Sequence, residues 1–281
     1  MRINVYDVKL GQCVMIVTPN GQRVMIDAGD NYDRSWYPSE MFRGQTLARF
    51  ICSNFDEDHL SDFEDLRKNC PMVGIHKNPT VGSSQLMTMK TLLGMGNGTK
   101  AMYDFLRLSE TQPGGIYNPT YLGDIEIAEF WNSYGTFYET NDLSLVTFVR
   151  RGSFSIMFPG DIERAGIKEL LKNPAFVEEL KKVTVLVAPH HGRENACCEE
   201  MFGIGKCNPM AVIISDDNIQ YASQENCDWY SARTSGCKTR MQETRRILTT
   251  RRDGHITLDV NPDGSWLITT EVELEKMRKS V

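Results

Sequence analysis

Two short stretches decide the fold of this chain: Ser-Asn-Phe-Asp-Glu-Asp-His at residues 53–59 and Ala-Pro-His-His-Gly at residues 188–192. Together they hold three of its five histidines. Each follows an apolar run, over residues 47–52 and 183–187, that favours a β-strand. Side chains of the types that bind metals therefore stand at the ends of two strands, where an α/β sandwich can gather them around an ion.

The composition is that of an ordinary globular protein. Its 281 residues and 41% hydrophobic content are sufficient for a sizeable core. No stretch approaches the roughly 18 apolar residues of a membrane span, and the first residues lack the apolar core of a signal peptide. Eight cysteines without paired spacing favour reduced thiols over disulfides or a zinc knuckle. We therefore expect a cytoplasmic protein with no membrane attachment.

Charge gives a mixed indication about nucleic acid. The formal net charge of −6 provides no global attraction to a polyanion. Residues 238–252, however, carry six basic side chains against one acid, and a helix is predicted over 238–248. This segment is either a surface that follows a nucleic-acid backbone or an ordinary amphipathic helix with solvated arginines.

The pattern of apolar runs indicates two sheets packed face to face and covered by helices, because blocks of strands alternate with helices twice. One domain is expected over residues 1–281. Residues 82–123, where glycine clusters interrupt helical segments, are predicted to be an insertion that forms a lid or surface subdomain. The predicted strands cover residues 3–8, 13–17, 23–26, 47–52, 125–130, 143–149, 154–158, 183–187 and 211–215, with a closing hairpin over 255–270. The predicted helices cover 40–49, a segment from residue 60, 162–171, 175–182, 197–202 and 238–248.

The first stretch places Asp56, Asp58 and His59 on one loop. Hard oxygen donors with one imidazole suit zinc, manganese or iron. The alternative is that Asp58 only caps a helix, where a carboxylate satisfies free backbone amides. Asp161 follows Pro-Gly at the end of an apolar strand and has the same two interpretations, as a ligand or as a turn residue.

His190 and His191 in the second stretch are adjacent, so their imidazoles point to different sides of the chain. One can bind a metal while the other supports it or contacts substrate. The residues alone do not choose between the two histidines.

The order of these segments resembles the metallo-β-lactamase superfamily, and within it the ComEC-type competence hydrolases. The resemblance covers most of the chain. It implies an αββα sandwich of two mixed sheets flanked by helices, with a loop-built site at one edge and metal-dependent hydrolysis as the activity. The motifs that carry it are Asp-Val-Lys-Leu-Gly-Gln-Cys at 7–13, Met-Ile-Asp-Ala-Gly at 25–29, residues 53–59, Asn-Asp-Leu-Ser-Leu-Val at 141–146, Phe-Pro-Gly-Asp-Ile at 158–162, and residues 188–192.

Carried over by position, the resemblance implies two metal sites that share Asp161. The first consists of Asp58, His59, Asp161 and either His190 or His191. The second consists of Asn54, Asp56, Asp161 and either Asn141 or Asp142. Asp27 would orient the ligands from behind.

Two departures from the family make the predicted sites unequal. Asn54 stands where the family has its first histidine, and a neutral amide is a poor ligand for a transition metal. The family's late histidine has no counterpart in residues 218–223. We therefore expect one tight site and one weak site for zinc or manganese, with magnesium as a further option. Either a second ion arrives with the substrate phosphate or a single ion does the work.

The chemistry that the resemblance implies is hydrolysis of a phosphodiester by a water whose pKa falls from about 16 toward about 7 on the ion. Asp58 or Asp161 could orient that water and accept its proton. Lys9 and Arg193 stand beside motif turns, either as phosphate contacts or as exposed surface charges.

Three functions follow. The leading hypothesis is a nuclease or phosphodiesterase acting on DNA rather than RNA, with a protein partner and a role in bacterial defence against phage suggested by the family's distribution. The second is hydrolysis of a cyclic nucleotide, another phosphate ester or a lactone, with residues 82–123 closing a pocket. The third is a degenerate scaffold that binds without cutting.

Overall fold

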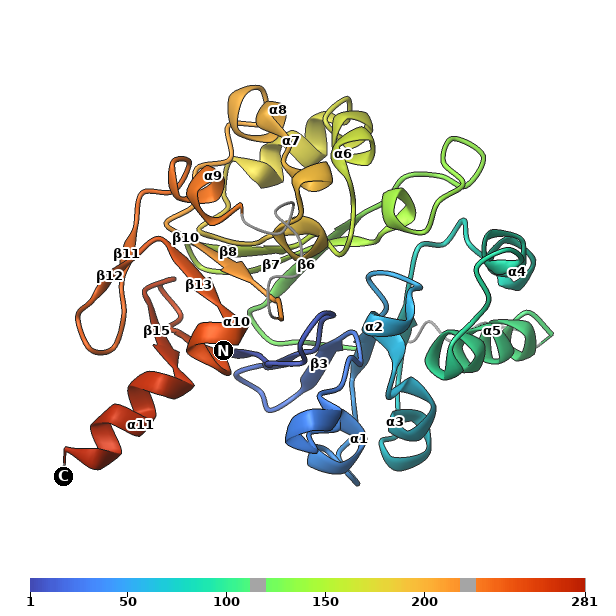
Figure 1. The fold of residues 1–281 in the computed structure, drawn as a ribbon, viewed down its shortest axis with the longest axis horizontal. Coiled ribbons are helices and arrows are strands. Elements are labelled where there is room, and N and C mark those ends of the chain that lie inside the picture. The colour runs from blue at the N-terminus through green and yellow to red at the C-terminus, as the bar shows by residue number, and fades with distance from the viewer. Residues whose placement is uncertain (112–119, 218–225, 281) are drawn as a thin grey trace.

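Two β-sheets face each other in the computed structural model, which describes residues 1–111, 120–217 and 226–280 (Figure 1). The first sheet has the strand order β15-β14-β1-β2-β3-β4-β5, and the second has the order β13-β10-β9-β8-β7-β6. Both sheets are mixed, because β3, β4 and β5 run parallel in the first and β8, β9, β10 and β13 run parallel in the second, while the other neighbours pair antiparallel.

Most strands overlap the predicted runs, but β5 was not predicted and β13 lies where a helix was expected. Those of the first sheet are β1 (Arg2–Val5), β2 (Val14–Val17), β3 (Arg23–Ile26), β4 (Arg49–Ile51), β5 (Ile75–His76), β14 (Ile256–Val260) and β15 (Trp266–Thr270). Those of the second are β6 (Glu126–Phe130), β7 (Val146–Arg151), β8 (Phe154–Phe158), β9 (Val185–Val187), β10 (Ala211–Ile214) and β13 (Ile247–Thr249).

Apolar side chains fill three layers, one between the two sheets and one between each sheet and its helices. This arrangement confirms the predicted αββα sandwich. The central layer joins side chains of both sheets, such as Ile16 and Ile156. A second layer lies between the first sheet and its helices and contains Phe50 and Phe63. A third contains Phe148 and joins the second sheet to its helices. Strands buried on both faces explain the continuous apolar runs in the sequence.

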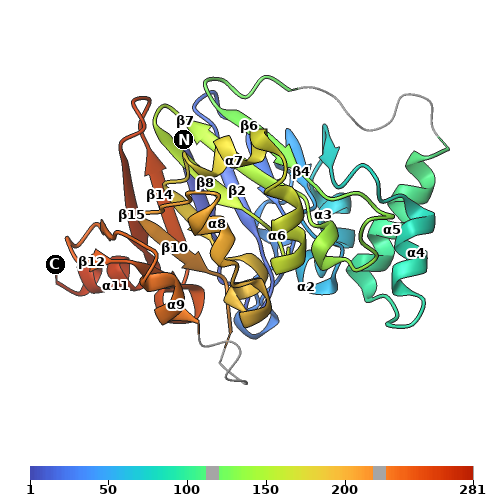
Figure 2. The ribbon, with the colours of Figure 1, turned by 90° about the horizontal axis from the view of Figure 1, so that it is seen from above.

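The helices cover the outer faces of the sheets. Figure 1 shows α6, α7 and α8 above the second sheet and α1 and α3 on the opposite side of the molecule. In Figure 2, α4 and α5 lie together at one end, away from the C-terminal α11. The helices are α1 (Pro38–Met41), α2 (Glu57–Leu60), α3 (Phe63–Asn69), α4 (Ser83–Lys90), α5 (Asn97–Ser109), α6 (Arg164–Leu170), α7 (Pro174–Leu180), α8 (Glu199–Gly203), α9 (Cys227–Ser231), α10 (Thr250–Asp253) and α11 (Glu271–Lys279). In the described ranges no helix is long and apolar enough to cross a membrane.

Two predicted helices are wrong. The one over residues 238–248 is replaced by β11 (Cys237–Lys238), β12 (Thr244–Arg245) and β13. Residues 247–249 complete the second sheet by pairing with β10, and this tertiary pairing overrides the helical spacing of the segment. The helix over residues 40–49 is also wrong, because α1 ends at Met41 and the chain then enters β4.

The region predicted as an insertion contributes α4 and α5 to the helical layer of the first sheet. Leu86 and Met102 from these helices are fully buried in the same apolar layer as Phe63. Residues 112–119 of this region lie outside the described ranges. The boundaries 82–123 and the role as a lid stay a prediction.

The parallel strands place the candidate ligands at one edge of the sandwich. β3 and β4 in the first sheet end just before Asp27 and residues 53–59. β8 and β9 in the second sheet end just before Asp161 and residues 188–192. The carboxyl ends of neighbouring parallel strands lie at the same edge, so both sheets direct these loops toward one place.

The close approach of α5 to α2 gives a test of the packing. A Cβ on Gly98 would lie 1.8 Å from the carbonyl oxygen of Leu60, which belongs to the backbone and cannot move aside easily. Gly98→Ala should therefore lower the free energy of unfolding by about 1–3 kcal/mol in urea titrations, although alanine favours a helix. Gly203→Ala in α8 is the matched control, since nothing lies within 4 Å of its Cβ position. Equal stability of the two variants would contradict this packing.

Candidate metal centre

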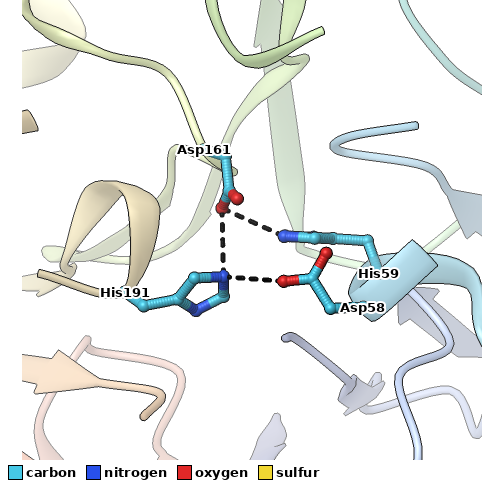
Figure 3. Close-up of side chains that lie close together, drawn as sticks. All are labelled: Asp58, His59, Asp161 and His191. Carbon is cyan, nitrogen blue, oxygen red and sulfur yellow. Dashed lines mark hydrogen bonds and ion pairs between the residues drawn. The ribbon is translucent and has the colours of Figure 1, made fainter. Parts of the chain in front are cut away.

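Four ionisable side chains from both sheets meet at the strand ends (Figure 3). Asp58 and His59 lie in α2 after β4, Asp161 follows β8, and His191 lies in the 3-10 turn Pro189–Gly192 after β9. One ligand atom from each lies within 4.8 Å of the other three. Among the described residues, this is the one group of histidine, cysteine and carboxylate side chains close enough to hold an ion.

The distances place two imidazole nitrogens beside the Asp161 carboxylate. His59 Nε2 lies 3.0 Å from Asp161 Oδ1, and His191 Nε2 lies 3.4 Å from the same oxygen. His191 Nε2 is also 3.2 Å from Asp58 Oδ2, yet it is buried and makes no hydrogen bond of acceptable geometry. Two imidazole nitrogens and two carboxylate oxygens suit zinc, manganese or iron. These residues therefore fit a divalent ion.

The group is closed on most sides and open at one. The side chains of His59, His191 and Asp161 are at most 5% exposed, whereas that of Asp58 is 35% exposed. Solvent can therefore reach the group at Asp58.

Asp27 holds His59 from behind, as expected for a residue that orients a ligand. Its Oδ2 lies 2.8 Å from His59 Nδ1, and its Oδ1 accepts a hydrogen bond from the backbone of Ser53 at 2.7 Å. Gln12 Nε2 donates to Oδ2 at 3.0 Å. With Nδ1 directed at Asp27, Nε2 is the nitrogen of His59 that faces the group and could bind an ion.

The backbone sends the two adjacent histidines to different sides. His190, His191 and Gly192 have φ angles of 47°, 53° and 73°, a run of left-handed conformations that is strained for non-glycine residues. His191 Nδ1 donates to the carbonyl of Ser215 at 3.0 Å, which turns its Nε2 into the group. The geometry thus selects His191 from the pair.

His190 lies outside the group. Its Nε2 accepts a hydrogen bond from Arg193 Nη1 at 3.2 Å and lies 3.9 Å from Asp161 Oδ2. Its Nδ1 is 3.4 Å from Glu163 Oε1. Burial lowers the pKa of His190 despite the nearby Asp161 carboxylate. A neutral imidazole therefore faces Glu163 next to the centre.

The charge balance among these four side chains depends on their protons. Burial opposes the charged form of His191, but Asp161 and Asp58 raise its pKa to about 10. Burial likewise opposes charge on His59, yet Asp161, Asp27 and Asp58 raise its pKa well above the ordinary value. Burial would raise the pKa of Asp161, and the two imidazoles hold it well below its usual range. The carboxylates thus favour a positive charge on each of the two imidazoles. A divalent ion would supply the same total charge.

Apart from Asp161, the residues predicted for the second site have other partners. Asp56 pairs with Lys90 of α4 and accepts a hydrogen bond from Thr140 at 2.9 Å. Asp142 Oδ1 accepts from the backbone of Glu163 at 3.1 Å and of Gly166 at 2.9 Å, at the start of α6. Asn54 Nδ2 donates to Asn141 Oδ1 at 3.2 Å. The structure does not bring these side chains into the four-residue group, and residues 218–223 lie outside the described ranges.

The two predicted phosphate contacts lie in different surroundings. Lys9 forms an ion pair with Asp33, and its ammonium stands 3.7 Å from the centre of the Tyr32 ring. Arg193 lies beside His190 and lines a surface cavity of about 440 Å³. Of the two predicted phosphate contacts, Arg193 is therefore the one that lies next to the centre.

Three further contributors were not foreseen from the sequence. Ser53 and Gln12 bind Asp27, and Ser215 fixes His191 through its backbone carbonyl. Ser53 and Gln12 do lie within motif stretches, so a search for partners of Asp27 could have found them. Ser215 follows β10 in no motif, and only its parallel pairing beside β9 brings it to His191.

Sequence comparisons identify no relative, since neither a family model nor a curated protein sequence matches the chain. Solved structures do match. One is CmlA, a diiron beta-hydroxylase from Streptomyces venezuelae, with a TM-score of 0.51 and 12% identity over 92% of this chain and 54% of CmlA. The predicted metallo-β-lactamase fold is confirmed.

A second similar structure is a diphosphatase from the PhnP family, with a TM-score of 0.41 and 11% identity over 90% of this chain and 85% of that protein. This chain spans about half the length of CmlA, 54% by coverage. At these identities the likeness concerns the metallo-β-lactamase fold alone. The candidate metal centre therefore rests on the geometry of this chain.

The role of Asp27 can be tested by Asp27→Asn. Asparagine tolerates the left-handed backbone at this position, where φ is 59°, but it removes the charge that fixes the His59 proton. Metal affinity should fall by about 10- to 100-fold in competition with a chelator. Asp65→Asn, at an exposed side chain on α3, is the matched control. If both variants bind metal as the wild type does, Asp27 does not orient the ligand.

The raised pKa values of His59 and His191 predict that metal binding releases protons. In the metal-free protein at pH 7 both imidazoles hold protons, and ligation requires their lone pairs, so about two protons should leave. Affinity should therefore rise with pH as far as about 10, the pKa of His191. Calorimetry in buffers of different ionisation enthalpy measures the number released. A binding enthalpy that is independent of the buffer would show that no proton is displaced.

Proposed function

We propose that this chain is a metal-dependent hydrolase that cleaves phosphodiester bonds. The observation that carries the proposal is the candidate metal centre, in which two imidazoles and two carboxylates meet at the edge of a metallo-β-lactamase fold with Asp58 open to solvent. A divalent ion bound there would supply Lewis-acid polarisation and a water of lowered pKa.

The residues divide the work by their exposure. His59 and His191 would bind the ion through Nε2, with Asp27 and Ser215 fixing their orientation. Asp161 is buried between the two imidazoles and would act as a ligand. Asp58 is the member that water can reach, so we assign it the orientation of the attacking water and the acceptance of its proton.

A phosphate substrate is supported by the cations beside the centre. Arg193 and Arg164 line the cavity of about 440 Å³ together with Glu194 and Asn195. Arg193 also contacts His190, which lies 3.9 Å from Asp161. Guanidinium groups bind phosphate oxygens in pairs of hydrogen bonds, so this cavity suits a phosphate next to the one that is cleaved.

DNA is the proposed substrate, ahead of RNA, on the strength of the ComEC-type motifs. The basic segment 238–252 gives less support than its composition indicates. Arg240, Arg245 and Arg251 form ion pairs with Asp259, Asp253 and Asp216, and are thus partly neutralised. A protein partner and a role in defence against phage rest on the resemblance alone.

The assay that tests the function uses purified protein with plasmid DNA and with RNA, in manganese, magnesium, zinc or ferrous iron. Iron is included because the similar CmlA is a diiron enzyme. His59→Ala and Asp161→Asn should reduce cleavage below detection, since the first removes a ligand and the second replaces a carboxylate with a neutral amide, which is a poor ligand. Asp65→Asn, at an exposed carboxylate on α3, should leave the rate unchanged.

The same preparation should be given p-nitrophenyl phosphate, bis-p-nitrophenyl phosphate, a cyclic nucleotide and a lactone. If these compounds are hydrolysed while DNA and RNA stay uncut, the chain is a small-molecule hydrolase and the nuclease hypothesis is rejected. Cleavage of DNA that persists in both ligand variants would reveal a contaminant. Metal binding without turnover of any substrate would favour the scaffold.

A further inference from the structure

The hairpin of α4 and α5 holds the metal loop at successive residues. Thr99 Oγ1 donates to the carbonyl of Phe55 at 3.1 Å. The Glu57 carboxylate accepts hydrogen bonds from the backbone of Gly98 and Thr99, both at 2.9 Å, and so caps the first turn of α5. Between these two residues, Asp56 is held by Lys90. The loop that carries Asp58 and His59 is therefore fixed by this hairpin.

Lys90 is an unusual member of this contact because its charge is buried. The residue is 8% exposed and is the last residue of α4. Its ammonium forms an ion pair with Asp56 Oδ1, the oxygen that also accepts the hydroxyl of Thr140. A lysine is rarely buried unless its charge is paired, so Asp56 and Lys90 compensate each other.

The remaining oxygen donors on this side of the centre are also engaged. Asn54 Oδ1 accepts from the backbone of Asp56 at 2.9 Å, and its Nδ2 donates to Asn141 and, at 3.4 Å, to Ser144 Oγ. Ser144 Oγ in turn accepts from the backbone of Asp161 at 3.1 Å. Asn141 Nδ2 donates to Glu163 Oε1 at 2.9 Å. A continuous polar network thus runs from Lys90 through Asp56, Asn54 and Ser144 to the backbone amide of Asp161.

We propose that the Lys90 ammonium takes the place of a second cation beside Asp56, so that the centre holds one divalent ion. The inference rests on the proposed metal-dependent function and specifies how many ions it uses. A divalent ion next to Asp56 would have to displace the ammonium or stand close to it, and repulsion between the two charges opposes this. Lys90 is thus a positioning residue that supplies a fixed positive charge on this side of the centre.

Metal counting tests the proposal without any substrate. Wild-type protein should bind one manganese ion per chain in equilibrium dialysis up to millimolar manganese. Lys90→Met keeps the length of the side chain and removes the charge, which frees Asp56 as a ligand. It should bind a second, weaker ion, and this ion should be lost in the Lys90→Met, Asp56→Asn double variant.

Two controls separate the charge of Lys90 from its packing. Lys90→Arg keeps the charge and should bind one ion, and Lys100→Met changes an exposed lysine on α5 and should do the same. Two ions in the wild type, or a single ion in folded Lys90→Met, would overturn the proposal. If Lys90→Met does not fold, Asp56→Asn decides: unchanged affinity for one ion supports the proposal, and weaker binding of the tight ion contradicts it.

The outcome is separable from that of the cleavage assay. If the wild type binds one ion, Lys90→Met binds two, and neither cleaves any substrate, the role of Lys90 is supported and the hydrolase function is rejected. If the wild type cleaves DNA and binds two ions, the hydrolase function is supported and the role of Lys90 is rejected.

Discussion

The contact between His59 and Asp161 is the interaction on which the centre depends, because it joins the two sheets. His59 comes from the loop after β4 in the first sheet, and Asp161 follows β8 in the second. Both side chains are buried, so each needs a partner of opposite charge or a bound ion to offset lost hydration. Asp27 behind His59 and Ser144 behind the backbone of Asp161 hold the pair in register.

The backbone strain at His190 and His191 is the second constraint. Left-handed conformations at three successive residues place one imidazole in the centre and the other against Glu163 and Arg193. A Cβ on Gly192 would meet the Ile214 side chain at 3.2 Å, so β10 packs tightly beneath this turn. Such strain persists only where surrounding contacts impose it, and it is common at functional sites.

The two sides of the centre differ in what their oxygen donors contact. Toward Asp58 the group is open to solvent, whereas toward Asp56 it is closed by hydrogen bonds and by Lys90. The closed side is formed by α4 and α5, which share an apolar layer with the first sheet. The helices of the predicted insertion are therefore connected to the metal loop through both packing and charge.

The sandwich and most of its strands could be predicted from residue types alone, because strands buried on both faces need continuous apolar runs. The sequence also identified Asp58, His59 and Asp161 as ligand candidates. The tertiary structure decided between His190 and His191, brought Ser215 to the centre and paired Asp56 with Lys90. It also turned residues 238–248 into strands through pairing with β10. These contacts join segments distant in the chain, and their geometry follows from packing and charge compensation that no local pattern encodes.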